Sequence, residues 1–177
     1  MDTKTRIGIV APARAIDEGI AAKVSALAGD AAELVFHPQC FQREGHFAGP
    51  DSARAAAFAD SANDASLDAI WFARGGYGAC RIIDTAFANL GKAARRKTYL
   101  GYSDAGNLLA RLARDGIGRV AHGPMPADIL REGGEAAVRR ALGFLTGTGD
   151  GAGIDPAARA PGRYAAFNIS VFASLIG

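Results

Sequence analysis

A serine between an apolar segment and a helical pattern is the residue best placed here for nucleophilic chemistry. Ser103 follows the apolar residues 98–101 in the order Gly-Tyr-Ser-Asp, and a helical pattern begins near Ala105. Strand, sharp turn and helix in this order form a nucleophile elbow, which presents a serine Oγ to a substrate. The match is loose, because Ala105 stands where the elbow motif has glycine. In the alternative interpretation, Ser103 or Asp104 only caps the helix.

A glycine-rich segment, Arg74-Gly75-Gly76-Tyr77-Gly78, follows the apolar residues 69–73 and leads into another helical pattern. Glycines allow a sharp turn and leave backbone N–H groups uncovered, which predicts a cradle for an anion or an oxyanion. The spacing is not Gly-x-Gly-x-x-Gly, and no Lys-Ser/Thr pair follows as in a P-loop, so a nucleotide is disfavoured. A tight turn without a ligand remains the alternative.

A serine nucleophile needs a base that accepts its proton and a third group that orients the base. His122, after the expected strand at residues 119–121, is the one histidine that the order of segments brings near Ser103, because His37 and His46 follow the second apolar segment. The residues alone therefore make His122 the candidate base. The alternative is a histidine ring packed under the loops at the strand ends, and no acid completes a triad.

Short apolar segments alternate with alanine-rich helical patterns along the chain, which predicts a βαβ series. Because parallel strands present their carboxyl ends at one edge of a sheet, we expect the two motifs and His122 at that edge. Asp51 is expected to cap the second helix and Asn168 the last one. The expected strands are residues 7–11, 33–36, 69–73, 98–101 and 119–121, with a sixth at 164–167; the expected helices are 16–28, 51–63, 79–90, 105–115 and 135–145.

The composition is that of one ordinary globular domain. The chain has 177 residues, 49% of them hydrophobic and 21% charged, and a net charge of +2 with scattered Lys and Arg, which disfavours nucleic acid as a partner. The first apolar run is too short for a signal peptide or a membrane span, so a cytoplasmic protein is expected. Cys40 and Cys80 lack the spacing of a disulfide framework or a zinc site. Residues 146–162 have the composition of a surface loop.

Five segments of the chain resemble, in order and spacing, the serine LD-carboxypeptidases. This family is also called the muramoyltetrapeptide carboxypeptidases, and microcin C immunity peptidases belong with it. Arg-Gly-Gly-Tyr-Gly followed about 25 residues later by Gly-Tyr-Ser-Asp is the most specific part of the resemblance. The segments are Ile7-Gly-Ile-Val-Ala-Pro-Ala, Asp68-Ala-Ile-Trp-Phe-Ala-Arg-Gly-Gly-Tyr-Gly-Ala-Cys-Arg, Lys97-Thr-Tyr-Leu-Gly-Tyr-Ser-Asp, His122-Gly-Pro-Met and Asn168-Ile-Ser-Val-Phe-Ala-Ser-Leu-Ile-Gly.

The resemblance implies an α/β fold with an open parallel sheet and helices on both faces, as in flavodoxin-like and class I glutamine amidotransferase-like domains. It also implies that Ser103 is the nucleophile and that the backbone N–H groups of Gly76 and Asp104 form the oxyanion hole. The family hydrolyses the amide between an L-centre and a terminal D-amino acid, typically D-alanine of a murein tetrapeptide during cell-wall recycling, without metal or cofactor. Residues expected to line the site or bind substrate are Arg74, Gly75, Tyr77, Tyr102 and His122.

The family takes the Glu and His of its triad from a second domain, which follows the segment that begins at Asn168. Residues 1–177 are therefore expected to be an N-terminal, nucleophile-bearing domain that is inactive without its C-terminal domain, and His122 then lines the site instead of acting as base. Expected partners are a murein peptide or a peptidyl-nucleotide antibiotic, the second domain and a second copy of the chain. A non-catalytic domain that binds a small anion remains the alternative function.

Overall fold

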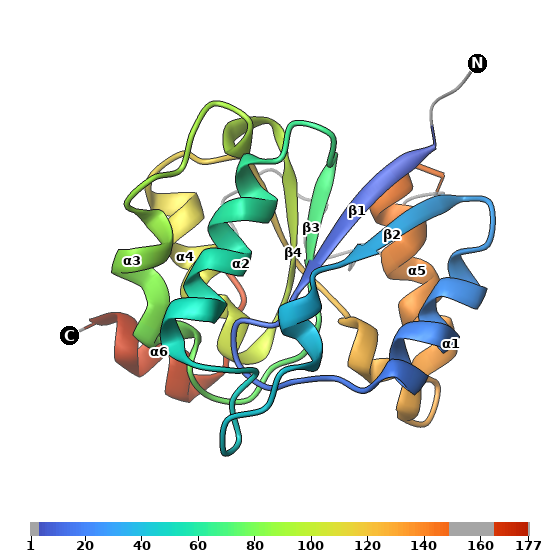
Figure 1. Cartoon of the computed structure of the whole chain (residues 1–177), viewed down its shortest axis with the longest axis horizontal. Helices are drawn as coiled ribbons and strands as arrows, with labels where there is room; N and C mark the ends of the chain where they lie inside the picture. The colour runs from blue at the N-terminus through green and yellow to red at the C-terminus, as the bar shows by residue number, and fades with distance from the viewer. Residues whose placement is uncertain (1–3, 149–164, 177) are drawn as a thin grey trace.

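The computed structural model describes residues 4–148 and 165–176, and its centre is one parallel β-sheet (Figure 1). The strand order is β2-β1-β3-β4-β5, and every adjacent pair is parallel. This confirms the expected open α/β sheet, and the order is that of flavodoxin-like folds. The strands are β1 Thr5–Val10, β2 Ala32–Phe36, β3 Ala69–Phe72, β4 Thr98–Gly101 and β5 Arg119–His122.

Helices cover both faces of the sheet, with α2, α3 and α4 on one side and α1 and α5 on the other (Figure 1). Successive residues of β3 face opposite sides of the sheet. Phe72 packs in one core with Phe58 of α2, and Trp71 packs in the other core with residues of α1 and α5. All four residues of β3 are buried, as expected of a central parallel strand. The helices are α1 Glu18–Ala28, α2 Asp51–Asn63, α3 Ile83–Phe87, α4 Gly106–Arg114, α5 Gly134–Thr146 and α6 Ile169–Ile176.

Several sequence expectations about element boundaries are wrong. The expected helix over residues 79–90 is a 3₁₀ turn, η2 Ala79–Ile82, followed by the short helix α3. No strand forms at residues 165–167, and Tyr164 lies outside the described residues. The expected loop over residues 146–162 also lies outside them, except for its first three residues, of which Thr146 still belongs to α5.

The two capping expectations have different outcomes. Asn168 does cap α6, because its Oδ1 accepts the N–H of Val171 at 2.8 Å. Asp51 makes no capping hydrogen bond; Pro50 occupies the cap position of α2. The Asp51 carboxylate is paired with two arginines, Arg54 and Arg81, which outcompete the helix N-terminus for it.

The order of the strands predicts at which edge of the sheet a ligand would bind. The chain runs from β1 outward to β2 and then returns to β3 on the other side of β1, so the segments after β1 and β3 diverge at their carboxyl ends. Ligands of doubly wound sheets bind at such a switch point. The segments that follow β1, β3, β4 and β5 at this edge therefore contain the candidate site.

The two cysteines are free thiols. Cys40 is buried, its Sγ donates to the carbonyl of Ile9 at 3.1 Å, and burial raises its pKa to about 12, which describes an inert structural residue. Within the described ranges, no cluster of His, Cys, Asp and Glu has the makings of a metal site. No helix among those residues has the length and apolar character of a membrane span.

Candidate active site

Ser103 lies on a sharp, strained turn at the carboxyl end of β4. Tyr102 is extended, with φ −156° and ψ −170°. Ser103 then turns to φ 59° and is the one non-glycine residue with positive φ in the described part of the chain. Such a conformation costs of order 1–3 kcal/mol and is maintained only by its surroundings. The sharp turn predicted from the sequence is confirmed. Ser103 opens the 3₁₀ turn η4 Ser103–Ala105, which leads into α4, and it makes no capping hydrogen bond.

The side chain of Asp104 connects this turn to the segment after the glycine loop. Asp104 is buried, and its Oδ2 accepts the N–H of Ala79 at 2.8 Å, while Asn107 Nδ2 donates to the Asp104 carbonyl at 3.0 Å. Burial raises the pKa of the Asp104 carboxyl, although the hydrogen bonds and the charge of Arg54 oppose that effect. Since Ala79 begins the helix after the glycine loop, Asp104 ties the two motifs together. Its own backbone N–H lies in the first turn of η4, where a helix provides no acceptor.

The glycine loop approaches Ser103 so closely that a side chain at Gly75 would collide with the serine side chain. A Cβ placed on Gly75 would lie 3.0 Å from both Cβ and Oγ of Ser103. Gly76 has φ 138°, a conformation that side chains disfavour, and a Cβ there would lie 2.5 Å from Cγ of Arg14. The loop therefore brings bare backbone beside the serine, which is the arrangement that an oxyanion hole requires.

A fully buried arginine that the sequence analysis missed holds the surrounding loops. Arg54 of α2 is 0% exposed. Its guanidinium donates to the carbonyls of Pro12, Gly49 and Gly78, the last at 2.9 Å, and pairs with the carboxylate of Asp51. Arg54 thus joins the segment after β1 to the glycine loop after β3. The available signal was a single positive charge among the alanines of the helix, and an ordinary exposed arginine gives the same pattern.

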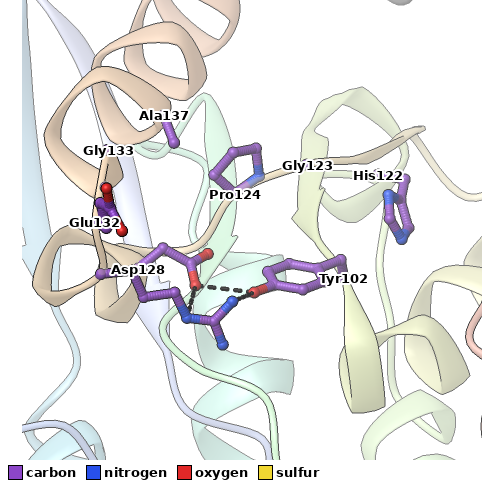
Figure 2. A pocket seen from close by; sticks show the side chains of 10 residues that line it. Tyr102, His122, Gly123, Pro124, Asp128, Glu132, Gly133 and Ala137 are labelled. Atoms are coloured by element: carbon purple, nitrogen blue, oxygen red, sulfur yellow. Dashed lines mark hydrogen bonds and ion pairs between the residues drawn. The ribbon is translucent and has the colours of Figure 1, made fainter.

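A second polar cluster surrounds the hydroxyl of Tyr102, the residue before Ser103. The Tyr102 hydroxyl donates to Asp128 Oδ1 at 2.8 Å and accepts a hydrogen bond from Arg131 at 2.8 Å. Asp128 Oδ2 also accepts the N–H of Met125 at 2.8 Å. Figure 2 shows Tyr102 and Asp128 pointing toward each other. Burial and the neighbouring carboxylate raise the pKa of Tyr102. No local sequence pattern marks Asp128 and Arg131, which belong to the segment after β5.

Two cavities meet at this cluster. The first, of about 380 Å³, contains Ser103 together with the predicted residues Arg74, Gly75, Gly76 and Tyr102. The second, of about 320 Å³, is lined by Tyr102, Asp128 and His122 (Figure 2). Tyr77 lines neither; it is 54% exposed, and its ring lies 6.2 Å from that of Phe47. The structure therefore gathers most of the predicted residues around Ser103 and leaves Asp104, His122 and Tyr77 outside the lining of that cavity.

The imidazole of His122 contacts the ring of Tyr102, the residue before Ser103. The two rings make an edge contact with centroids 5.8 Å apart, and Asp128 lies on the opposite side of Tyr102 (Figure 2). In the sheet, His122 pairs with Gly101, two residues before the serine. Its side chain is exposed, contrary to the packed ring considered from the sequence, and partial desolvation lowers its pKa. Neither Ser103 Oγ nor the imidazole has a hydrogen-bond partner among the described residues, so this geometry does not make His122 a base.

His122→Gln should accordingly change turnover by less than about tenfold in the active protein, whereas loss of a true general base costs several orders of magnitude. The measurement is a pH–rate profile of the variant beside that of the unaltered protein, and the acidic limb should persist in both. Disappearance of that limb in His122→Gln would identify His122 as the base after all.

Comparison with known proteins agrees with this geometry. Residues 7–123 match the family model described as LD-carboxypeptidase N-terminal domain. A Streptomyces coelicolor protein provisionally named a carboxypeptidase is 35% identical over 129 residues, which are 70% of this chain and 41% of that protein. A similarly named Rickettsia conorii protein is 31% identical over 127 residues, 71% of this chain and 39% of its own length. The chain thus spans about two fifths of the length of these curated relatives.

Solved structures show the same architecture. The muramoyltetrapeptide carboxypeptidase of Oxalobacter formigenes superimposes with a TM-score of 0.60 and 26% identity, over 70% of this chain and 42% of that one. An MccF-like protein of Bacillus anthracis superimposes with a TM-score of 0.67 over 82% of this chain and 45% of its own, and at 18% identity it supports the fold alone. The family match covers both the glycine loop and the serine turn, and the chain belongs to the LD-carboxypeptidase family, as its N-terminal domain.

Proposed function

We propose that Ser103 is the nucleophile of a serine-type LD-carboxypeptidase. The proposed reaction is hydrolysis of the amide between an L-centre and the C-terminal D-amino acid of a murein peptide, D-alanine in the first place, during cell-wall recycling in the cytoplasm. The observation that carries the proposal is the φ of 59° at Ser103, directly beside the bare backbone of Gly75. A strained serine without a structural hydrogen bond has no evident role in folding, and strain of this kind concentrates at functional sites.

In the proposed reaction, Ser103 Oγ attacks the carbonyl carbon of the last peptide bond. The carbonyl oxygen becomes an oxyanion that accepts hydrogen bonds from the N–H groups of Gly76 and Asp104. Collapse of this intermediate expels the terminal amino acid as its amine and leaves an acyl-enzyme, which water then hydrolyses. Arg74, Gly75 and Tyr102 line the cavity in which the peptide end would lie.

The proton of Ser103 must pass to a base, and within residues 4–148 and 165–176 no histidine or carboxylate is hydrogen-bonded to Oγ. We assign that role to a histidine, oriented by a glutamate, in a C-terminal domain beyond residue 177. The lengths of the relatives support this assignment, since each covered region is under half of the matched protein. Residues 1–177 alone would then retain only the weak reactivity of a protonated hydroxyl.

A non-catalytic function as an anion-binding domain is the second candidate. It is favoured by Arg14 and Arg74, which line the cavity beside the glycine loop. A fluorophosphonate probe separates the two candidates, because it forms a covalent bond to an activated serine oxygen with loss of fluoride. Labelling at Ser103 in the complete protein favours the peptidase, and stabilisation by phosphate without labelling favours the binding domain.

The decisive measurement is D-alanine release from a murein tetrapeptide by residues 1–177, by the complete protein, and by the two domains mixed as separate chains. We expect turnover in the last two samples and almost none in the first. Full turnover by residues 1–177 would show that the base lies within them. An aminoacyl sulfamoyl nucleoside offered in parallel tests the antibiotic-type substrate, since the solved MccF structures include one with glutamyl sulfamoyl guanosine.

Gly76→Val should lower turnover in the complete protein roughly 100- to 1000-fold, the usual cost of losing one oxyanion donor. The φ of 138° disfavours valine, and its Cβ would press on Arg14, so the N–H would move away from the site. Gly116→Ala is the control, because Gly116 also has positive φ but faces open space after α4. Unchanged turnover in Gly76→Val would remove Gly76 from the oxyanion hole.

A further inference from the structure

The cavity around Ser103 carries more positive than negative charge. Three arginines and one aspartate line it: Arg14, Arg74, Arg131 and Asp128. Arg131 is engaged, since its Nε lies 3.2 Å from Asp128 Oδ1 and its guanidinium also donates to the Tyr102 hydroxyl. Arg14 and Arg74, in contrast, make no hydrogen bond or ion pair with any other described residue. Two guanidinium charges in the cavity are therefore left without a partner of opposite charge.

The backbone on either side fixes where these two arginines emerge. Arg14 follows β1 between the buried residues Ala13 and Ala15, and the Ala13 carbonyl accepts the N–H of Ala48 at 2.9 Å. Arg74 lies two residues after the end of β3. It follows Ala73, whose N–H and carbonyl are both hydrogen-bonded. Each side chain thus begins at a hydrogen-bonded backbone segment at the edge of the sheet.

The Arg14 side chain also contacts Gly76, whose N–H belongs to the proposed oxyanion hole. Its Cγ and Cδ pack where a Cβ of Gly76 would be, at 2.5 and 2.6 Å from that position, and the adjacent Gly75 abuts Ser103. Consecutive Cα atoms are about 3.8 Å apart. The aliphatic part of the Arg14 side chain therefore packs against the glycine loop that abuts Ser103, in the lining of the same cavity.

Part of the cavity lining is apolar. Ile20 of α1 and Met125, Ala127 and Leu130 of the segment after β5 complete its lining. A ligand that fits this combination has a compact anionic group and a small apolar group side by side. The C-terminal residue of a peptide, with its α-carboxylate and a short side chain such as a methyl group, has this chemistry.

We propose that Arg14 and Arg74 bind the free α-carboxylate of the substrate's terminal residue and so restrict the enzyme to removing one residue from a chain end. The inference rests on the proposed function and adds the group that selects the end of the peptide. The carboxylate carbon is three bonds from the scissile carbonyl carbon, which matches the proximity of Arg14 to Gly76. Guanidinium groups suit the task, because they can donate two parallel hydrogen bonds to a carboxylate.

The test compares two tetrapeptides that differ only in a C-terminal carboxylate or carboxamide, in the complete protein. The unaltered protein should favour the carboxylate, and Arg14→Gln or Arg74→Gln should lower the ratio of kcat/KM for the carboxylate to kcat/KM for the carboxamide roughly 10- to 100-fold. Arg14→Lys should restore part of the preference. Arg139→Gln removes the same charge from the exposed face of α5, where Arg139 pairs with Glu135, and should have no effect.

A binding measurement separates this inference from the proposed reaction. Residues 1–177 with Ser103→Ala should bind the carboxylate peptide more tightly than the carboxamide, and addition of Arg14→Gln should abolish the difference. If both arginine variants keep the carboxylate preference while Ser103→Ala abolishes turnover, the carboxylate site is wrong and the nucleophile stands. If Ser103→Ala remains active but the binding preference depends on the arginines, the site stands and the nucleophile is wrong.

Discussion

Replacing Ser103 with alanine should lower turnover of a murein tetrapeptide by roughly 10⁴- to 10⁶-fold in the complete protein, the range found when a triad nucleophile is removed. Alanine lacks the oxygen that attacks the carbonyl but keeps a Cβ of the same size beside Gly75, so the neighbouring backbone should not move. Oxyanion donors and substrate binding would remain and give the residual rate. The measurement is single-turnover release of D-alanine, with circular dichroism as the check on folding.

Ser52→Ala provides the matched control, since Ser52 is an exposed serine in the first turn of α2. It should retain full turnover, and fluorophosphonate labelling should be lost in Ser103→Ala alone. Comparable turnover in the two variants would eliminate Ser103 as the nucleophile. Labelling that persists in Ser103→Ala would place the reactive oxygen elsewhere in the protein.

Arg54→Met should lower the free energy of unfolding by about 3–5 kcal/mol, a large part of the stability of an ordinary domain. Methionine fills most of the volume but cannot donate to the carbonyls of Pro12, Gly49 and Gly78, which would be left without their buried partner. The measurement is urea denaturation of residues 1–177. Because two of these carbonyls belong to loops at the site, substrate binding by the surviving folded protein should weaken as well.

Arg81→Met is the control for Arg54→Met, because Arg81 pairs with the same carboxylate, that of Asp51, from an exposed position. Both variants remove one partner of Asp51, yet only the Arg54 variant removes donors from buried carbonyls. We expect Arg81→Met to change stability far less. Equal losses would mean that the ion pair with Asp51, and not the carbonyl contacts, makes Arg54 important.

The core strands could be predicted from the sequence because their apolar, β-branched runs are short and end at proline, glycine or polar residues. The strand 98–101 is predicted to the residue, and the others differ by one or two residues at an end. The helix over 79–90 is wrong because α3 is only one turn long, whereas the alanine content of that segment suits a longer helix. The prediction that Asp51 caps its helix is wrong, because the residue type and position that favour capping do not reveal an arginine that competes for the carboxylate.

The site could be predicted only as far as local patterns extend. Ser103 and the glycine loop were found because strand, turn and helix follow each other within ten residues. Arg14 and Arg54 were missed because their importance comes from contacts with segments far away in the chain, and a lone arginine among alanines looks the same whether it is buried or exposed. Topology did bring His122 next to β4, but the direction of its ring depends on the packing of Tyr102, which no local pattern encodes.

The positive φ of Ser103 also bears on how this protein would respond to selection. Glycine adopts a φ of 59° without strain, so the residue that catalysis is proposed to need is not the one that stability favours at this position. A library of variants selected for soluble, folded protein alone should therefore accumulate glycine at position 103, whereas selection for hydrolysis should retain serine. Thermostable variants would then carry glycine at the position of the proposed nucleophile.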